Sequence, residues 1–299
     1  MHYIDLWDRN RSLGRADVPA ILSAPTSDFK YELKRVVRTG GNGVVFEAYR
    51  LRKQGGLDRR CAIKLLRRQD PARIDRFSNE ARVLRELGTH ERIAPYYDDG
   101  TVEIRVGQAY QVPWIAMELG GANLRDHVGK NGPLSSDTVI KVGVHLAEAL
   151  AHLHGKGFIH RDIKPANLVW EDEHLGGALL IDLGIAKRQT EDVSARPLDN
   201  FTRQGEFVGP VFFSSPELIA YAEDQTHRVD HRSDIFQLGK VLWYLATGKI
   251  SAGIPSKRDC PLGGRLHAFV LETLADSPDD RPSSAGVIIE HLKNINGTG

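Results

Sequence analysis

The sequence has little cysteine, little net charge and no long apolar run. Its 299 residues include two cysteines, Cys61 and Cys260, which lie far apart, so neither a disulfide framework nor a cysteine-rich zinc site is expected. The formal net charge of +1 gives no electrostatic reason to expect binding to nucleic acid or to an anionic membrane. No apolar run reaches the roughly 20 residues of a membrane helix, and residues 1–15 carry charges where a secretory signal is apolar. These absences favour a cytoplasmic protein with no membrane segment.

The apolar pattern changes along the chain. Residues 1–28 are polar and interrupted by proline, and we expect an extension with some local structure there. Residues 29–119 favour strands, apart from one amphipathic helix in which apolar residues recur at spacings of three and four between Ile74 and Leu87. Residues 120–299 favour helices, which we expect near residues 139–153, 235–245, 265–275 and 283–294. The pattern predicts an α+β protein in which a small β-rich lobe precedes a larger helical lobe.

The strongest local signal is the run HRDIKPAN at residues 160–167. Phosphoryl transfer from ATP needs a carboxylate to orient the attacking hydroxyl, a cation near the γ-phosphate and an oxygen ligand for Mg²⁺. Asp162, Lys164 and Asn167 supply these three groups within one short loop. The run resembles the catalytic loop of eukaryotic-type (Hanks-type) protein kinases of the serine/threonine branch, in particular compact bacterial members, and the resemblance extends over residues 33–292. It implies the bilobal protein-kinase fold.

The resemblance also implies a metal site and a phosphate-binding loop. The run DLG at residues 182–184 is similar to the D-F-G motif of that family, with leucine in place of phenylalanine. Asp182 and Asn167 are therefore the implied ligands of Mg²⁺, or of Mn²⁺ in its place. The run RTGGNGVV at residues 38–45 resembles the glycine-rich loop that covers the ATP phosphates, although Arg38 stands where the first glycine is usual. Its phosphate-contacting residues would be Gly40, Gly41, Asn42 and Gly43.

Lys64, in the run CAIK at residues 61–64, is similar to the lysine that contacts the nucleotide phosphates in that family. A lysine in an apolar strand needs a counter-charge because an unpaired buried cation is costly. Glu80, beside the apolar stripe of the expected helix, is the favoured partner, and Glu86 is the competitor. By the same resemblance, the residues that contact adenine would be Val45, Ala62, Met117, Glu118, Leu119 and Val169.

Three further matches to the family are structural. The run SPE at residues 215–217 resembles the end of the activation segment, and Arg281 matches the arginine that pairs with its glutamate. Asp234 matches the buried aspartate that braces the catalytic loop. Kinases that act on small molecules lack the SPE-type motif and its arginine, so these residues favour a protein substrate over that alternative.

Two cues in the sequence disagree about the substrate hydroxyl. Lys164 followed by Pro165 is typical of serine/threonine kinases, whereas Pro210 stands where that branch usually has a threonine and is closer to the tyrosine-type pattern. We expect ATP- and Mg²⁺-dependent transfer of the γ-phosphoryl group to protein serine or threonine hydroxyls, including autophosphorylation. Tyrosine phosphorylation stays as an alternative. A pseudokinase, which keeps the fold without catalysis, is a second alternative because of Arg38, Leu183 and Pro210.

The histidines around residues 145–154 could indicate a metal site, but a role in packing or on the surface is the favoured interpretation. His145, Glu148, His152 and His154 lack the His-Glu-x-x-His spacing and follow a good apolar stripe, and Cys61 is expected to be a small core residue.

Regulation is expected to involve Arg161. An arginine before the catalytic aspartate can bind a phosphorylated residue of the activation segment through charge-assisted hydrogen bonds. Thr202 is the first candidate for that residue, with Thr190 and Ser194 as alternatives. If Arg161 instead pairs with Asp192 or Asp199, the enzyme would be active without modification.

Overall fold

The structure, a computed structural model, describes residues 2–41, 43–171, 176–183, 186–188, 211–224, 226–251 and 264–296. The chain forms two compact units. Unit 1 comprises Met1–Thr89 and Ala94–Leu119, and unit 2 comprises His90–Ile93 and Gly120–Gly299. Several residues named in the sequence predictions lie outside the described residues: Asn42, Gly184, Cys260 and the segment 189–210, which holds Thr190, Asp192, Ser194, Asp199, Thr202 and Pro210.

Unit 1 is built on an antiparallel six-stranded sheet with the strand order β3-β4-β5-β6-β8-β7. The strands are β3 (Ile21–Leu22), β4 (Phe29–Thr39), β5 (Gly43–Arg52), β6 (Leu57–Leu66), β7 (Tyr96–Val106) and β8 (Gln108–Met117). The β5–β6 turn contains Gly55 and Gly56, whose φ angles of 107° and 92° suit glycine. The expectation of strands in this part of the chain is confirmed.

Helix α1 (Pro71–Leu87) interrupts the strands of unit 1, as its apolar spacing predicts. Asp70 caps its first turn by accepting a hydrogen bond from the Arg73 backbone N–H, and Pro71 occupies the first helical position. Gly88 follows its end with a φ of 71°. Its buried face consists of Phe77, Glu80, Ala81, Val83, Leu84 and Leu87. A carboxylate on this apolar face needs a partner close by.

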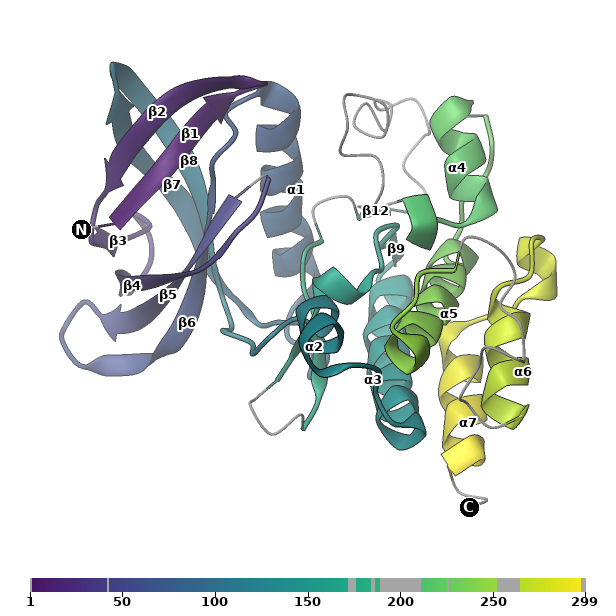
Figure 1. The fold of residues 1–299 in the computed structure, drawn as a ribbon. Coiled ribbons are helices and arrows are strands. Elements are labelled where there is room, and N and C mark those ends of the chain that lie inside the picture. Colours follow the sequence, from purple (N-terminus) through teal and green to yellow (C-terminus); the bar gives the residue numbers. More distant parts are fainter. Residues whose placement is uncertain are drawn as a thin grey trace. The chain divides into compact units, whose positions relative to one another are not determined.

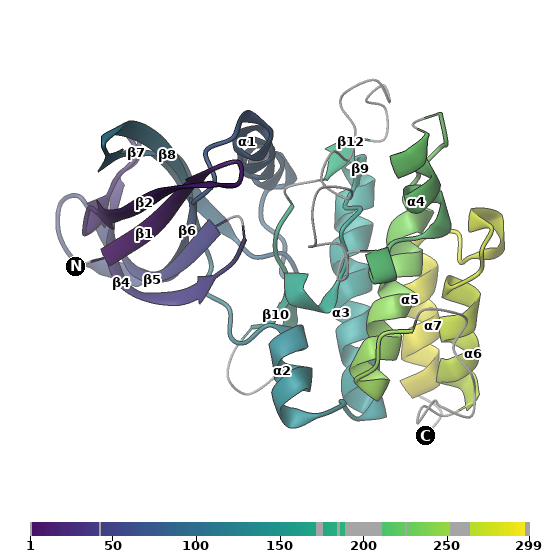
Figure 2. The same ribbon diagram turned by 45° about the horizontal axis from the view of Figure 1, so that its top comes forward.

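The first residues of the chain form a packed hairpin, where the sequence suggests an extension with some local structure. β1 (His2–Asp8) pairs antiparallel with β2 (Arg11–Val18). Ile4, Leu6, Ala16 and Val18 are all buried and join the same hydrophobic cluster as Phe46 and Trp114 of the sheet. In both ribbon views the hairpin, drawn in purple, lies against the strands of unit 1 (Figures 1 and 2). The hairpin is therefore part of the core of unit 1.

Unit 2 is mainly helical (Figure 1). Glycines allow its helices to approach one another closely: a Cβ on Gly143 would lie 2.8 Å from Leu292 and 3.0 Å from Leu242. The helices described are α2 (Leu124–Asn131), α3 (Ser136–Gly155), α4 (Pro216–Glu223), α5 (Arg232–Thr247), α6 (Gly264–Thr273) and α7 (Ala285–Asn296). The four helices expected from the sequence correspond to α3, α5, α6 and α7, while α2 and α4 are additional.

Two short antiparallel strand pairs frame the loops of unit 2. β9 (Phe158–Ile159) pairs with β12 (Lys187–Arg188), and β10 (Leu168–Trp170) pairs with β11 (Ala178–Leu180). The run at residues 160–167 therefore lies between β9 and β10 and ends in a single 3-10 turn, Pro165–Asn167. No helix within the described residues is long and apolar enough to cross a membrane.

Candidate active site

The loop at residues 160–167 is held by a buried carboxylate from α5. Asp234, which is fully buried, accepts hydrogen bonds from the backbone N–H groups of His160 at 2.9 Å and Arg161 at 2.7 Å. Arg161 has a φ of 65°, in the left-handed region that non-glycine residues rarely occupy. Such a conformation persists when its surroundings fix it. The two bonds to Asp234 therefore help set the loop geometry.

Two residues that the sequence did not single out for this purpose complete the support. His154 contacts Asp234 through Nε2 at 2.8 Å. Gln237 lies about one helical turn after Asp234, accepts from the Ile163 N–H at 3.0 Å and donates to the Arg161 carbonyl at 3.2 Å. A polar residue three positions from Asp234 on the same helix face is the signal that could have identified Gln237.

These contacts keep Asp234 ionised. Burial alone would raise the pKa of Asp234, but its hydrogen bond and electrostatic interaction with His154, together with the bonds from the loop at residues 160–167, outweigh it and hold that pKa below its usual value. For His160 the balance is the reverse: burial lowers the pKa of its imidazole, and the nearby carboxylates, Asp234 among them, raise it by less. The loop is thus anchored on an anion and a neutral imidazole.

The three residues of this loop that are predicted to take part in the chemistry lie together. The Lys164 Nζ donates to Asp162 Oδ2 at 2.6 Å. The Asn167 Nδ2 donates both to the Asp162 carbonyl at 2.9 Å and to Asp162 Oδ2 at 3.1 Å. Because its amide nitrogen is directed to Asp162, the amide oxygen of Asn167 is the atom that can ligate a cation.

Asp182 lies beside Asn167 through strand pairing. Leu168 pairs with Leu180, and the Ile181 N–H donates to the Asn167 carbonyl at 2.9 Å. Asp182 follows with a φ of 65°, while the next residue, Leu183, is fully buried. One carboxylate and one amide oxygen are hard ligands that suit Mg²⁺ or Mn²⁺, so the donor set fits the implied metal. Within the described residues no group of three or more His, Cys, Asp or Glu side chains could hold a metal ion.

In unit 1, the structure brings together Lys64 and Glu80. Lys64 Nζ lies 2.8 and 2.7 Å from the two carboxylate oxygens of Glu80, which is 2% exposed. Glu86, the competitor, instead forms an ion pair with Arg82 at 3.1 Å. The buried carboxylate of α1 therefore has the strand lysine as its partner.

The glycine-rich segment forms the turn between β4 and β5. The Gly40 N–H donates to the Gly43 carbonyl at 2.9 Å, and a Cβ on Gly43 would lie 2.8 Å from the Leu65 carbonyl oxygen. Only glycine fits there without a shift of backbone. In the sheet, Val45 pairs with Lys64 and Ala62 pairs with Met117. These neighbours of Lys64 belong to the set predicted to contact adenine.

The segment after β8 is fixed on the unit 1 side by Glu118. Its N–H donates to the Pro95 carbonyl at 2.9 Å, and its carboxylate accepts hydrogen bonds from the Tyr97 hydroxyl and the Leu119 N–H. In unit 2, Val169 is 8% exposed, and a Cβ on Gly120 would lie only 2.4 Å from its Cγ2. Gly120 therefore permits a close approach of its backbone to Val169. The sequence predictions did not include this role of Gly120.

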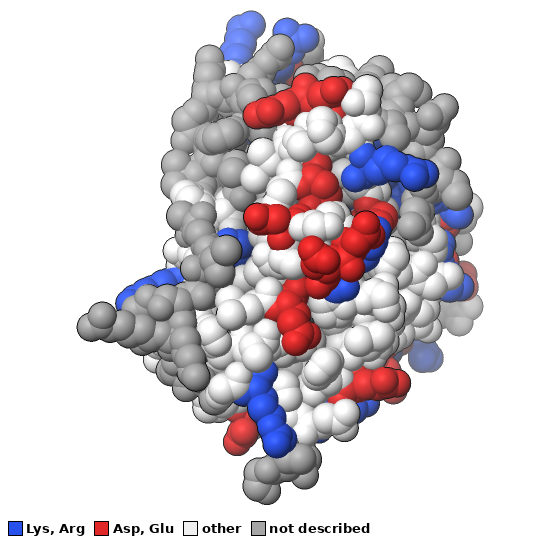
Figure 3. All heavy atoms as spheres, turned by 90° about the vertical axis from the view of Figure 1, so that its right-hand side faces the viewer, with Lys and Arg blue, Asp and Glu red and all other residues white. Residues whose placement is uncertain are grey.

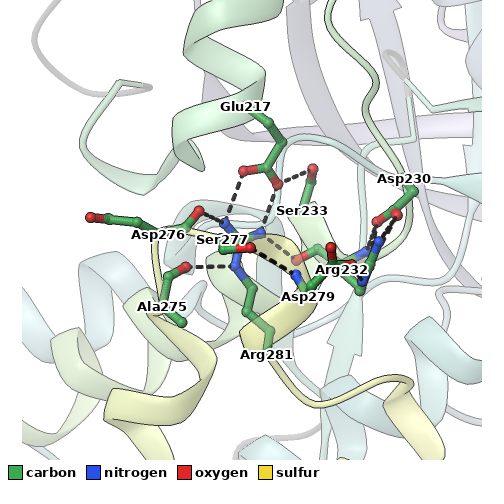
Figure 4. A network of polar contacts seen from close by, with 9 residues as sticks. All are labelled: Glu217, Asp230, Arg232, Ser233, Ala275, Asp276, Ser277, Asp279 and Arg281. Carbon is green, nitrogen blue, oxygen red and sulfur yellow. Dashed lines mark hydrogen bonds and ion pairs between the residues drawn. The ribbon is translucent and has the colours of Figure 1, made fainter.

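Glu217 and Arg281 form the centre of a polar network in unit 2 (Figure 4). Arg281, whose side chain is fully buried, binds both carboxylate oxygens of Glu217, at 2.7 and 2.9 Å. Ser233 also donates to Glu217, at 2.5 Å. Burial would raise the pKa of Glu217, but the hydrogen bonds from Arg281 and Ser233 outweigh it and hold that pKa below its ordinary value of 4.5. Figure 4 shows the two side chains pointing toward each other from α4 and from the turn before α7.

A band of carboxylates runs over the exposed surface on this side of unit 2 (Figure 3). Figure 3 views the molecule from the side of α4, α6 and α7 and shows Asp and Glu side chains gathered down the middle of that face. Arg232 is committed to Asp230 at 2.7 Å and to Asp279 at 2.5 Å. The Arg232 guanidinium is thus paired with carboxylates of the same unit.

The histidines of α3 take part in packing and hydrogen bonding. His145 accepts a hydrogen bond from the Ala178 N–H at 3.2 Å, His152 stacks on His90 at 4.6 Å, and Glu148 pairs with Arg92 at 3.1 Å. Burial lowers the pKa of His145 to about 4. In unit 1, Cys61 is fully buried, and burial raises the pKa of its thiol to about 12, as for a core residue.

Comparisons with known proteins identify the family of this chain. The model of the protein kinase domain family matches residues 31–259, and the chain belongs to that family. It is 31% identical over 277 residues to the serine/threonine-protein kinase PknB of Mycobacterium leprae, covering 86% of this chain and 41% of that protein. It is 32% identical over 287 residues to PknB of Mycobacterium tuberculosis, covering 89% of this chain and 43% of that protein. It is 29% identical over 297 residues to the serine/threonine-protein kinase pkn3 of Myxococcus xanthus, covering 90% and 50%. The chain therefore spans half or less of each of these relatives.

Proposed function

We propose that this chain transfers the γ-phosphoryl group of ATP to serine or threonine hydroxyls of proteins, its own included. The observation that carries the proposal is the hydrogen-bonded set Asp162, Lys164 and Asn167 on a loop whose backbone is anchored by Asp234. Positioned carboxylate, cation and amide oxygen are the groups that phosphoryl transfer requires. Membership in the protein kinase family supports the same reaction.

Each residue of the loop has a separate role in the proposal. Asp162 orients the attacking hydroxyl and accepts its proton, and Lys164 neutralises charge on the transferring group. Asn167 and Asp182 would hold Mg²⁺, or Mn²⁺ in its place, and the metal would supply charge neutralisation at the phosphate oxygens. The 2.6 Å contact between Lys164 and Asp162 means that the cation is already directed to the carboxylate.

The nucleotide roles fall on both units. In unit 1, Lys64, held by Glu80, would bind phosphate oxygens, and Gly40, Gly41, Asn42 and Gly43 would cover them through backbone N–H groups. The adenine contacts are assigned to Val45, Ala62, Met117, Glu118 and Leu119 in unit 1 and to Val169 in unit 2. With these roles, residues 29–119 correspond to the N-terminal lobe and residues 120–299 to the C-terminal lobe of a kinase.

Two features support serine or threonine as the acceptor, and a third supports the cytoplasm as the location. Lys164 contacts the carboxylate that would receive the hydroxyl proton, and a lysine at this position is typical of the serine/threonine branch. The relatives reported above are serine/threonine-protein kinases by name. The scarcity of cysteine suits a reducing compartment.

The test is incubation of the chain with labelled ATP, with and without Mg²⁺, and with generic protein substrates, followed by identification of the labelled amino acid. We expect Mg²⁺-dependent label on serine or threonine and a loss of at least about 100-fold in rate in Asp162→Asn. The matched control is Asp137→Asn, at an exposed carboxylate in the first turn of α3, which should keep the wild-type rate. A chain that binds nucleotide and transfers no label is a pseudokinase and contradicts the proposal. Label on tyrosine alone would contradict the assigned acceptor.

A further inference from the structure

The N-terminal hairpin is joined by backbone hydrogen bonds to the segment between β6 and α1. The Trp7 N–H donates to the Arg67 carbonyl at 2.9 Å, and the Gln69 N–H donates to the Trp7 carbonyl at 2.8 Å. Trp7 and Arg68 thereby form a parallel bridge. The buried side chains Ile4 and Leu6 fix β1 on the core of unit 1 on either side of Asp5. The hairpin therefore has a fixed register against residues 67–69.

Two arginines of this segment reach from the hairpin to the glycine-rich loop. Arg67 donates through Nε to the Asp5 carbonyl at 3.2 Å and through Nη1 to the Gly40 carbonyl at 3.2 Å. Arg68 donates through Nη1 to the Arg9 carbonyl at 2.6 Å and through Nε to the Gly41 carbonyl at 2.8 Å. Each guanidinium thus bridges one hairpin carbonyl and one glycine carbonyl. The planar fork of arginine suits such a bridge, and a lysine ammonium does not reproduce it.

Fixing the Gly40 carbonyl also fixes the direction of the backbone N–H group in the same peptide. A trans peptide is planar, with its C=O and N–H directed oppositely. The Gly40 carbonyl shares its peptide with the Gly41 N–H, so a carbonyl held by Arg67 directs that N–H away from the arginines. A free glycine-rich turn would otherwise sample many orientations of this peptide. The arginines therefore reduce the entropy that the loop would lose when it binds an anion.

The same segment continues into the helix that carries Glu80. Asp70, the next residue after Gln69, caps α1, and Gln69 binds the Leu66 carbonyl at 3.0 Å. The glycine-rich loop, the hairpin and the start of α1 thus meet at residues 67–70. All of these contacts lie within unit 1.

We propose that the N-terminal hairpin, acting through Arg67 and Arg68, preorganises the glycine-rich loop for the phosphates of a nucleoside di- or triphosphate. Both arginines are positioning residues, because they act on loop carbonyls. The inference rests on the proposed nucleotide site but not on turnover. It gives residues 2–18, all of which precede the part of the chain matched by the protein kinase family, a role in nucleotide binding.

The test compares binding of ADP with Mg²⁺ and binding of adenosine by calorimetry. Arg67→Gln/Arg68→Gln should weaken ADP binding by about tenfold, since hydrogen bonds from charged donors are lost. Adenosine binding should be unchanged, because adenosine has no phosphates. Arg60→Gln is the matched control: Arg60 lies on β6, the strand that precedes Arg67 and Arg68, contacts Glu47 at 2.8 Å and should leave both affinities at the wild-type value. Thermal unfolding of all variants shows whether the fold is kept.

Two further variants separate positioning from charge and from general damage. Arg68→Lys keeps the charge and loses the fork, so it should weaken ADP binding almost as much as Arg68→Gln. Trp7→Pro removes the N–H that binds the Arg67 carbonyl, and it should weaken ADP binding in the wild-type chain but add little in the double-glutamine background. Such non-additivity is expected if hairpin and arginines act as one device.

Three outcomes would overturn the inference: unchanged ADP affinity in the double-glutamine variant, equal losses for ADP and adenosine, or full rescue by Arg68→Lys. Failure of the proposed function looks different. A wild-type chain that binds ADP, shows the predicted differences and transfers no phosphoryl group would refute the kinase activity while supporting the positioning role.

Discussion

Glu80 and Glu86 lie on the same helix and show how burial decides a residue's role. Glu80 is 2% exposed and binds Lys64 at 2.7 Å, whereas Glu86 forms a surface pair with Arg82. Removing the charge of Glu80 takes away the buried carboxylate to which Lys64 is bound. We expect Glu80→Gln to lower kcat/KM by roughly 10- to 100-fold, because the lysine is no longer held in place.

The matched variant is Glu86→Gln, which removes an exposed i,i+4 pair of about 0.3–0.5 kcal/mol and should change kcat/KM by less than about twofold. Steady-state kinetics at varied ATP measures both. Equal losses in the two variants would show that Glu80 has no special role.

His145 should make the stability of unit 2 depend on pH. Burial lowers its pKa from 6.5 to about 4, so the unfolded chain binds a proton more readily than the folded chain between these values. The contribution of the neutral, buried His145 to the free energy of unfolding is complete above pH 6.5 and is lost as the pH falls toward 4. His145→Asn can still accept the Ala178 N–H but does not titrate.

We expect the wild-type chain to lose more unfolding free energy than His145→Asn between pH 7 and pH 4, by roughly 3 kcal/mol. Urea unfolding at several pH values measures the difference. The exposed His227→Asn is the control and should behave as the wild type. Identical pH dependences for wild type and His145→Asn would show that His145 titrates alike in the folded and unfolded chain.

At the scale of the elements, α4, α5 and the turn before α7 are joined by Arg281. Its guanidinium binds both oxygens of Glu217 and the carbonyls of Arg232, Ala275 and Asp276. Arg281→Met keeps much of the volume but leaves Glu217 with Ser233 as its remaining side-chain donor. Breaking a buried pair in this way costs about 3–5 kcal/mol. Denaturant unfolding should show that loss.

Arg232→Met is the comparison for Arg281→Met. Its carboxylate partners Asp230 and Asp279 are 30% and 84% exposed, so this variant should cost about 1 kcal/mol. If both variants cost the same, the buried network contributes no more than a surface pair. At low pH the two should converge, because the contribution of Glu217, whose pKa is lowered, is present above pH 4.5 and is lost as the pH falls through its folded-state value.

How much of the fold follows from the sequence depends on how many side chains an element buries. Helices α1, α3 and α5 each bury a long apolar stripe, and the spacing of those residues predicts them. Helices α2 and α4 each bury two side chains, which is too few for a period to be recognised. In β1, the buried Ile4 and Leu6 alternate with Tyr3, Asp5 and Trp7, and the two aromatic residues obscure the alternation of apolar and polar residues over so short a run.

The residues of the candidate site also differ in whether the sequence reveals them. Asp162, Lys164 and Asn167 were found because they lie within one run whose chemistry is readable, and their chemical roles stay predictions. Gln237 binds backbone atoms of the loop across 74 and 76 positions of sequence, and such contacts leave no local pattern. The positions of Arg67 and Arg68 depend on a hairpin that the sequence did not predict. Long-range contacts to backbone atoms are thus the part that required the structure.

At the scale of the whole molecule, the hairpin makes the domain larger than its family match. The match begins at residue 31, yet Ile4, Leu6, Ala16 and Val18 are buried in the core of unit 1. Removing them uncovers apolar surface worth on the order of 5 kcal/mol, a large part of the stability of an ordinary domain. We expect a chain shortened to residues 29–299 to show a partly unfolded unit 1.

Circular dichroism and proteolysis during urea titration measure this loss for the shortened chain. Ile21→Thr is the control, because Ile21 is 51% exposed on the edge strand β3 and should leave the urea midpoint unchanged. A shortened chain with the wild-type midpoint would show that the hairpin adds nothing to the stability of the core.

The placement of the four tryptophans gives the chain its own optical reporters. Trp114 is fully buried in unit 1, while Trp170 and Trp243 are buried in unit 2 at 2% and 4% exposure, so their emission should be blue-shifted and poorly accessible to quenchers. Trp7 is half-buried on the hairpin, with the Arg68 guanidinium 5.8 Å from its ring. A chain retaining only Trp7 should therefore report, through its emission wavelength and quenching by iodide, whether the hairpin is docked while nucleotide is added.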